Sequence, residues 1–237
     1  MRIHRISLPL SNAFLICDRK NLLVDAGCRT DFSELVKQIE NCGVRLKNLA
    51  GVVLTHVHFD HCGCASELRK AGVPVIACSQ SRKSLSDGVQ EGKTLLNNAP
   101  SFLRSSLQRT MPSAFPGVEV DVPVVDSLDL HDFGVDGRVA QTPGHTEASL
   151  SVILANNSAC VGDLVMGGVL GLPPAWKPAQ HPSSADFIAC LDQIQTLRKR
   201  GIESFYVGHG DVLEARHIDH WIAVKGSNSR AVQNSGS

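Results

Sequence analysis

The chain has 237 residues, of which 43% are hydrophobic and 19% are charged, values typical of a globular protein with a buried core. Its 23 basic residues balance 23 acidic ones, so the net charge of zero favours a small-molecule substrate and disfavours nucleic acid or an anionic membrane as partners. No apolar run approaches the ~20 residues of a membrane span and no secretory signal is evident, so we expect a cytoplasmic protein.

Strands dominate the first part of the chain. Apolar runs of strand length are found at residues 13–17, 21–25, 49–54 and 73–77. The first two flank three polar residues, which predicts a β-hairpin. Asp31 and Glu34 have the spacing of a capping box and predict a helix that ends near Gly43. A second, short helix is expected at residues 65–70.

Residues 79–117 differ in composition, because they are rich in serine, arginine, lysine and asparagine. They predict an insertion with one or two helices. Loops of this length in compact domains are often functional. Three roles stay open for the insertion: a lid over a site, a contact in a homodimer, and a surface excursion with no role in binding.

Strands resume after the insertion. They are predicted at residues 118–125, 138–142, 149–154, 159–161 and 204–207. Apolar residues at helical spacing predict a helix at 184–199 that packs one face on a core. No internal repeat or linker divides the chain, so we expect a single domain at 1–225, followed by a flexible tail at 226–237.

The most informative stretch is VVLTHVHFDHCGCA, at residues 52–65. It places His56, His58, Asp60 and His61 within six consecutive positions at the end of an apolar strand. Imidazole nitrogens and carboxylate oxygens bind zinc-like ions at ~2.0–2.2 Å. His56 and His58 can face one ion while Asp60 and His61 face a second. Six residues cannot complete two coordination spheres, so further ligands are required.

Further candidate ligands follow later strands in the same way. His145 follows a Pro-Gly turn, Asp163 follows Gly162, and His209 follows Gly208. If these strand ends converge on one edge of a sheet system, they gather all the candidates into one pocket. The repeated context predicts a metal site at that edge.

The motif THVHFDH, followed by His145, Asp163 and His209, resembles the ligand set of the metallo-β-lactamase superfamily. The likeness extends from LLVDAG at 22–27 to VGHGD at 207–211. It implies an α/β fold of the αββα type, a sandwich of two mixed β-sheets flanked by helices, with metals at one edge between the sheets. It also implies two divalent metal ions, zinc first, with manganese and iron as alternatives for nitrogen and oxygen ligands.

The resemblance further implies a role for each candidate. The implied first ion is bound by His56, His58 and His145, the second by Asp60, His61 and His209, and Asp163 bridges the two. A water molecule shared by two such cations is far more acidic than bulk water. The implied activity is a metal-dependent hydrolase in which Asp60 and Asp163 are the catalytic carboxylates.

Two branches of that superfamily fit best and predict a small ester, thioester or lactone as substrate. GDLVMGG at 162–168 is similar to a glycine-rich stretch of hydroxyacylglutathione hydrolases (glyoxalase II), although 28 residues after His209 (237 − 209) are too few for the helical domain of that branch. The 84 residues from His61 to His145 (145 − 61) accommodate the insertion of lactonase-like enzymes. Met166 stands where those enzymes often have a tyrosine.

Other activities are alternatives. Persulfide dioxygenases resemble this pattern but bind one iron through two histidines and an aspartate. Enzymes that hydrolyse β-lactams usually have cysteine or no ligand where Asp163 stands, which disfavours that activity. A regulatory module with a decayed site is also disfavoured, because all the expected ligands are present.

Several residues around the predicted site are weaker candidates. Met166, Leu170 and Trp176, in the loop after Asp163, could form an apolar wall for a substrate, or they could pack under the helix that follows. His181 is either on the rim of the same pocket or an ordinary loop histidine. Cys62 is expected to be a small residue near a helix start, and the other cysteines are expected to be free thiols.

Overall fold

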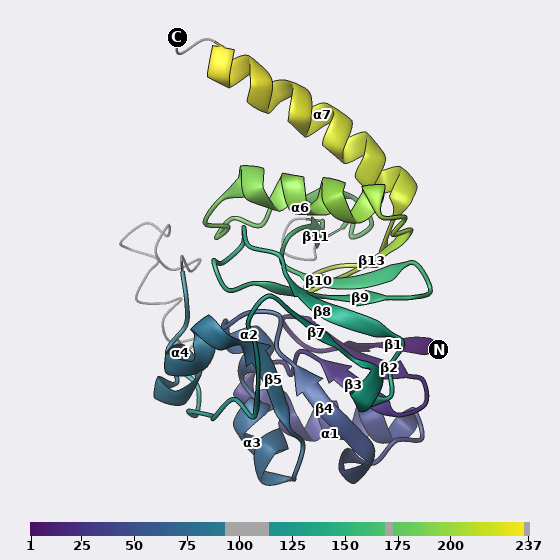
Figure 1. The fold of residues 1–237 in the computed structure, drawn as a ribbon, viewed down its shortest axis with the longest axis vertical. Coiled ribbons are helices and arrows are strands. Elements are labelled where there is room, and N and C mark those ends of the chain that lie inside the picture. The colour runs from purple at the N-terminus through teal and green to yellow at the C-terminus, as the bar shows by residue number, and fades with distance from the viewer. Residues whose placement is uncertain (93–113, 169–172, 235–237) are drawn as a thin grey trace.

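A computed structural model of the protein describes residues 1–92, 114–168 and 173–234, with side chains described as far as Lys225. Two six-stranded mixed sheets pack face to face, and helices cover the outer face of each (Figure 1). This arrangement confirms the αββα sandwich. Within the described residues, no helix combines the length and the apolar character that a membrane span needs.

The first sheet has the strand order β1-β2-β3-β4-β5-β6. Its strands are β1 Arg2–Ser7, β2 Asn12–Cys17, β3 Asn21–Val24, β4 Leu49–Val53, β5 Val75–Cys78 and β6 Val122–Val124. The first three strands are antiparallel neighbours, and β3 to β6 run parallel. The helices on its outer side are α1 Phe32–Asn41, α2 Phe59–Cys62, α3 Ala65–Lys70 and α4 Arg82–Asp87.

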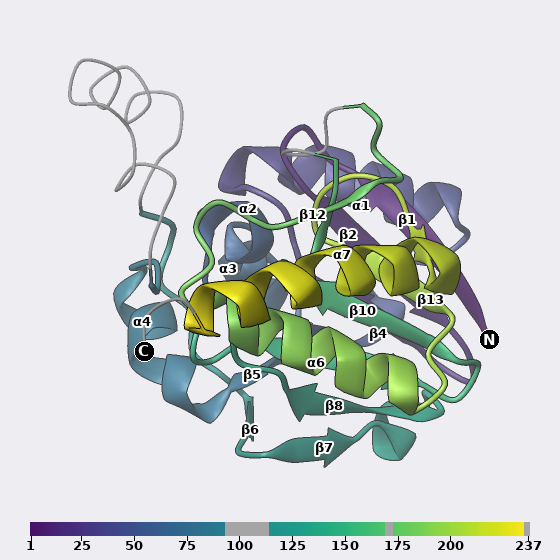
Figure 2. The same ribbon diagram turned by 90° about the horizontal axis from the view of Figure 1, so that it is seen from above.

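The second sheet has the order β14-β13-β10-β9-β8-β7. Its strands are β7 Ser127–Asp129, β8 Gly137–Gln141, β9 Leu150–Leu154, β10 Ser158–Gly162, β13 Ser204–Val207 and β14 Leu213–Glu214. Only β10 and β13 are parallel neighbours in this sheet. A small ribbon of β11 Met166–Gly167 and β12 Pro178–Ala179 stands apart, and α6 Phe187–Lys199 and α7 Ala215–Asn234 lie over the sheet (Figure 2).

Alternating side chains build three hydrophobic layers. Phe14 and Ile16 on β2 face the second sheet, whereas Leu15 between them faces the helices of the first layer. Ile153 on β9 faces the outer layer, where α6 packs. Since successive side chains of a strand point to opposite faces, a strand buried on both faces is a continuous apolar run. Full burial of each such side chain stabilises the fold by roughly 1.5–3 kcal/mol.

Most predicted elements are confirmed, and one interpretation, the capping box at Asp31, is wrong in detail. The Asp31 carboxylate does not cap its own helix, because it accepts a hydrogen bond from the Cys28 backbone N–H at 2.8 Å. The segment predicted as a tail from residue 226 is helical as far as Asn234, because α7 packs on the sheet through buried Ile218 and Trp221 and continues outward. Whether the end of this helix is flexible stays a prediction.

The predicted insertion is described only at its two ends. It contains α4, and buried Leu85 and Phe115 join the core beneath the first sheet. Residues 93–113 lie outside the described part of the chain. A role of the insertion as a lid or a dimer contact therefore stays a prediction.

Candidate metal centre

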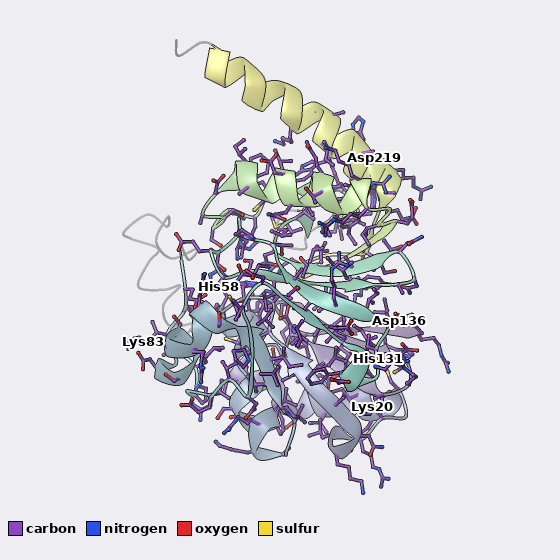
Figure 3. The ribbon with its side chains drawn as sticks, viewed as in Figure 1. Lys20, His58, Lys83, His131, Asp136 and Asp219 are labelled. Atoms are coloured by element: carbon purple, nitrogen blue, oxygen red, sulfur yellow. The ribbon has the colours of Figure 1, made fainter. Side chains whose placement is uncertain are left out.

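The candidate ligands converge at one edge of the sandwich, where several strands end. His56 and His58 follow β4, Asp60 and His61 lie in α2, His145 lies between β8 and β9, Asp163 follows β10, and His209 follows β13. His58 lies at this edge, whereas His131 and Asp136 lie at the opposite end (Figure 3).

Backbone hydrogen bonds join the strand ends beside the site. The Leu150 N–H donates to the Thr55 carbonyl at 2.7 Å, which connects the second sheet with the first. The Gly208 N–H donates to the Gly162 carbonyl at 2.9 Å, which joins the ends of β10 and β13. The loops that bear the ligands are therefore fixed to one another and not only to their own strands.

Three histidines form a compact triad. Nδ1 of His58 lies 3.1 Å from Nε2 of His56 and 3.1 Å from Nε2 of His145. Two ligand atoms ~2.0–2.1 Å from a tetrahedral zinc ion are ~3.3–3.4 Å apart. The triad therefore has the spacing of three ligands around one ion.

A second group lies beside the triad. Oδ2 of Asp60 is 3.5 Å from Nε2 of His209 and 3.8 Å from Nε2 of His61. Ser11 positions the segment, because its hydroxyl donates to the Asp60 carbonyl. These spacings are looser than those of the triad but still bring three ligand atoms around one point.

Asp163 stands between the two groups. Its Oδ2 lies 3.3–3.7 Å from the Nε2 atoms of five histidines. The distances are 3.3 Å to His209, 3.5 Å to His61 and His181, and 3.7 Å to His56 and His145. The carboxylate is therefore placed to contact cations bound on both sides of it.

The donor set fits divalent cations. Among the described residues, nothing hydrogen-bonds to Nε2 of His61 or to Oδ1 of Asp163, although both atoms are buried. A buried polar atom without a partner costs about 1–3 kcal/mol. Lone pairs on nitrogen and oxygen that face one another around a common point are the environment that a zinc-like ion requires.

Burial and charge set the protonation of the site. Burial lowers the pKa of His56 and His145 well below the ordinary value. Burial acts in the same direction on His61 and His209, but the neighbouring carboxylates, Asp163 first and Asp60 with it, together outweigh burial and raise the pKa of both. Burial opposes ionisation of Asp163, yet the surrounding histidines, His209 first, hold its pKa well below the usual range.

Outer hydrogen bonds orient the ligands. Four histidine nitrogens on the side away from the site face an oxygen acceptor: Nδ1 of His56 with Thr55 Oγ1 at 3.0 Å, Nε2 of His58 with the Glu91 carbonyl at 3.0 Å, Nδ1 of His61 with Asp25 at 2.9 Å and Nδ1 of His209 with the Leu10 carbonyl at 2.8 Å. A ring nitrogen that donates to an acceptor leaves the other nitrogen unprotonated in the neutral ring. In its neutral form, each of these histidines therefore offers a lone pair to the site.

Sequence reasoning missed Asp25. It follows β3 in the LLVDAG stretch, has a positive φ of 60°, and is 1% exposed. Its carboxylate accepts from the Thr55 backbone N–H and hydroxyl as well as facing His61. The sequence does carry a signal for Asp25, because this residue directly follows an apolar strand, as the candidate ligands do.

His181 belongs to the site. It is 4% exposed, and its ring packs against His145 with centroids 4.8 Å apart and against His209 at 5.4 Å. Burial lowers its pKa to about 4. The loop before α6 is tied to the His145 loop, since the Ala185 N–H donates to the His145 carbonyl at 3.0 Å.

The other weaker candidates are distributed differently. Met166 is buried on β11, close in sequence to Asp163. Trp176 is 54% exposed and its ring packs against His217 on α7. Leu170 lies outside the described residues. Cys62 is buried and its thiol donates to the His58 carbonyl at 3.0 Å, so it faces the backbone.

An αββα sandwich with a buried cluster of histidines and aspartates at one sheet edge defines an α/β protein with a candidate metal centre. The profile of the Metallo-beta-lactamase superfamily matches residues 8–209, and the chain belongs to this family. A probable metallo-hydrolase of Methanocaldococcus jannaschii is 27% identical over 208 residues, which cover 85% of this chain and 88% of the relative.

Solved structures show the same fold. The B3 metallo-beta-lactamase BLEG-1 matches with a TM-score of 0.67 and 20% identity, over 91% of this chain and 95% of its own. An archaeal metallo-beta-lactamase superfamily protein from Sulfolobus tokodaii matches with a TM-score of 0.66 and 20% identity, over 93% of this chain and 84% of its own. Identities this low support the fold and not a shared substrate.

Proposed function

We propose that the protein is a hydrolase that uses two divalent metal ions, zinc first, to cleave a small ester, thioester or lactone. One observation carries the proposal: Asp163 Oδ2 lies between two groups of ligand atoms, 3.7 Å from His56 on one side and 3.3 Å from His209 on the other. A single ion would leave one group of buried ligand atoms without a cation.

In this proposal His56, His58 and His145 hold one ion and Asp60, His61 and His209 hold the other, with Asp163 shared. Bound together, two such ions supply a water whose pKa falls from ~15.7 toward ~7 and a positive charge that polarises a carbonyl oxygen. Asp60 is 14% exposed at its side chain, more than the buried His61 and Asp163 beside it. It is therefore the carboxylate placed to orient a water that enters from solvent.

The substrate class rests on the lactonase-like and glyoxalase II-like features of the sequence. Met166, buried on β11 and close in sequence to Asp163, is the candidate for an apolar contact with the acyl part of a small ester or lactone. Trp176 is a weaker candidate for this contact, because its ring lies against His217.

The test is a substrate panel with protein reconstituted separately with zinc, manganese and iron. The panel contains a lactone, a thioester, a carboxylic ester, a phosphoester and a β-lactam, and proton release is measured with each. We expect hydrolysis of at least one of the first three, with full activity at two ions per chain. Inactivity on these three, together with oxygen consumption at one iron per chain on a persulfide, would overturn the proposal in favour of a dioxygenase.

A further inference from the structure

His181 differs from the candidate metal ligands in the hydrogen-bond partner behind its ring, that is, the partner of the ring nitrogen that faces away from the site. The Ser183 backbone N–H donates to Nδ1 of His181 at 3.3 Å, and the Ser183 hydroxyl lies 2.8 Å from the same nitrogen. A backbone N–H can only donate, so Nδ1 must present its lone pair. The ring proton of His181 is then on Nε2, the nitrogen that faces the site.

The contrast with the other histidines is a reversal of hydrogen-bond polarity. His56, His58, His61 and His209 each have an acceptor behind the ring, which leaves a lone pair toward the site. His181 has a backbone N–H donor behind the ring, which leaves an N–H toward the site. A nitrogen that carries a proton cannot bind a metal ion. By distance alone His181 could join Asp163 and His209 as a ligand, but its hydrogen bonds give it the opposite chemistry.

The Nε2–H of His181 also lies close to Asp163 and to both groups of candidate ligands. Nε2 of His181 is 3.5 Å from Oδ2 of Asp163, and the ring contacts one histidine from each ligand group, His145 and His209. The donor therefore faces the space that the two groups share. The Ser184 N–H returns to the His181 carbonyl at 3.2 Å, so the turn that bears both residues is closed locally.

We propose that His181 is a hydrogen-bond donor to the substrate carbonyl oxygen and not a metal ligand, and that Ser183 is the positioning residue that fixes its tautomer. This inference rests on the proposed function and extends it by naming the group that receives the negative charge of an acyl substrate.

The donor acts while water adds to the substrate. Water adds to the acyl carbon and loses one proton to solvent, while the carbonyl π electrons move to oxygen, which accepts from His181 Nε2–H. When the adduct collapses, those electrons re-form the C=O bond, the C–O or C–S bond breaks, and the leaving alkoxide or thiolate takes a proton from solvent. His181 keeps its proton throughout, so it stabilises charge without acting as an acid or a base. Removing one such donor typically costs about 10²–10³ in kcat.

The first experiment uses the unaltered protein, with histidine side chains labelled with ¹⁵N. Ring nitrogen shifts distinguish protonated, free and metal-bound nitrogens, and they are recorded before and after addition of zinc. We expect His181 to carry its proton on Nε2 in both samples, while the candidate ligands change on zinc addition. A metal-bound Nε2 of His181 in the zinc-loaded sample would overturn the proposal.

The second experiment compares variants loaded with zinc. His181→Phe keeps a flat ring but no donor, His181→Gln restores an N–H, and His220→Phe on the exposed side of α7 is the control. We expect His181→Phe to retain the zinc content of the unaltered protein and to lose about 10²–10³ in kcat with a smaller change in KM. His181→Gln should recover part of the loss. Ser183→Ala should lose less than His181→Phe, because the backbone N–H remains.

Several results would contradict the assignment. Loss of a zinc ion in a folded His181→Phe variant would make His181 a ligand, and an unchanged kcat would remove its role as a donor. If the unaltered protein hydrolyses none of the acyl substrates, the proposed function fails. The role of His181 as a donor to the substrate carbonyl oxygen then fails with it. The ring shifts then still decide separately whether His181 is a donor or a ligand, without any variant having to fold.

Discussion

Nδ1 of His61 lies 2.9 Å from Oδ2 of Asp25, and both side chains are almost completely buried. The same carboxylate accepts from the Thr55 hydroxyl, whose oxygen faces Nδ1 of His56. Asp25 therefore holds one histidine of each proposed ligand group, directly or through Thr55. Its left-handed backbone, with φ of 60°, is a strained conformation that persists where surrounding contacts enforce it.

Replacing Asp25 with asparagine keeps the shape of the side chain but removes its charge. We expect Asp25→Asn to weaken zinc binding about 10–100-fold, because the outer partner of a ligating histidine sets its tautomer and basicity. Competition with a zinc-binding dye measures this change. Asp136→Asn, an exposed residue at the opposite end of the sandwich (Figure 3), is the control. Equal zinc affinity in the two variants would show that Asp25 does not support the site.

Gly208 has no room for a side chain. A Cβ there would collide with Oδ1 of Asp163 and with the ring of His61. We expect Gly208→Ala to lose zinc binding and to be destabilised by about 1–3 kcal/mol, the usual cost of overpacking. Gly43→Ala is the control, because Gly43 has nothing within 4 Å but a φ of +81°, which costs an alanine about 1–2 kcal/mol. Only Gly208→Ala should lose zinc, and retention of zinc in that variant would contradict the described packing.

Cys62 is the thiol nearest in sequence to the histidine cluster. Burial raises its pKa well above the ordinary value, so the thiol stays protonated, and it donates to the His58 carbonyl. A serine hydroxyl can make the same hydrogen bond. We expect Cys62→Ser to keep its full zinc content by elemental analysis, whereas His61→Ala should lose zinc. A Cys62→Ser protein that folds but binds less zinc would make the thiolate a ligand.

Metal removal should destabilise the fold. Binding at a hundredfold excess over Kd adds roughly 2.7 kcal/mol of stability per ion. A chain of this size loses about 2–4 °C in Tm per kcal/mol. We therefore expect chelation of two ions to lower Tm by roughly 10 °C or more, measured by calorimetry. A His56→Ala and His209→Ala double variant should show no such shift, and an unchanged Tm on chelation of the unaltered protein would count against resident metal.

The sequence predicted the core elements and the candidate ligands because their signals are local. The run at 49–54 and the helix at 65–70 agree with β4 and α3 within a residue or two, and each candidate ligand follows an apolar strand. The helix α7 was missed although buried Ile218 and Trp221 have helical spacing. Attention to that spacing would have predicted a helix at the end of the domain at 1–225.

The roles of His181 and Asp25 depend on contacts between distant segments. His181 is separated by 36 residues from His145 and by 28 from His209 (181 − 145, 209 − 181), and only the closed sandwich brings the three rings together. No periodicity in the sequence reports such a contact. The polarity of the hydrogen bonds behind each ring is also a tertiary property, because it depends on which backbone group lies there.

The most direct test of the account is the position and number of metal ions. Crystals of the zinc-loaded protein should give anomalous difference peaks at the zinc absorption edge. We predict two peaks per chain, one within the His56, His58 and His145 triad and one among Asp60, His61 and His209, with Asp163 between them and His181 bound to neither. A single peak, or a peak bonded to His181, would contradict it.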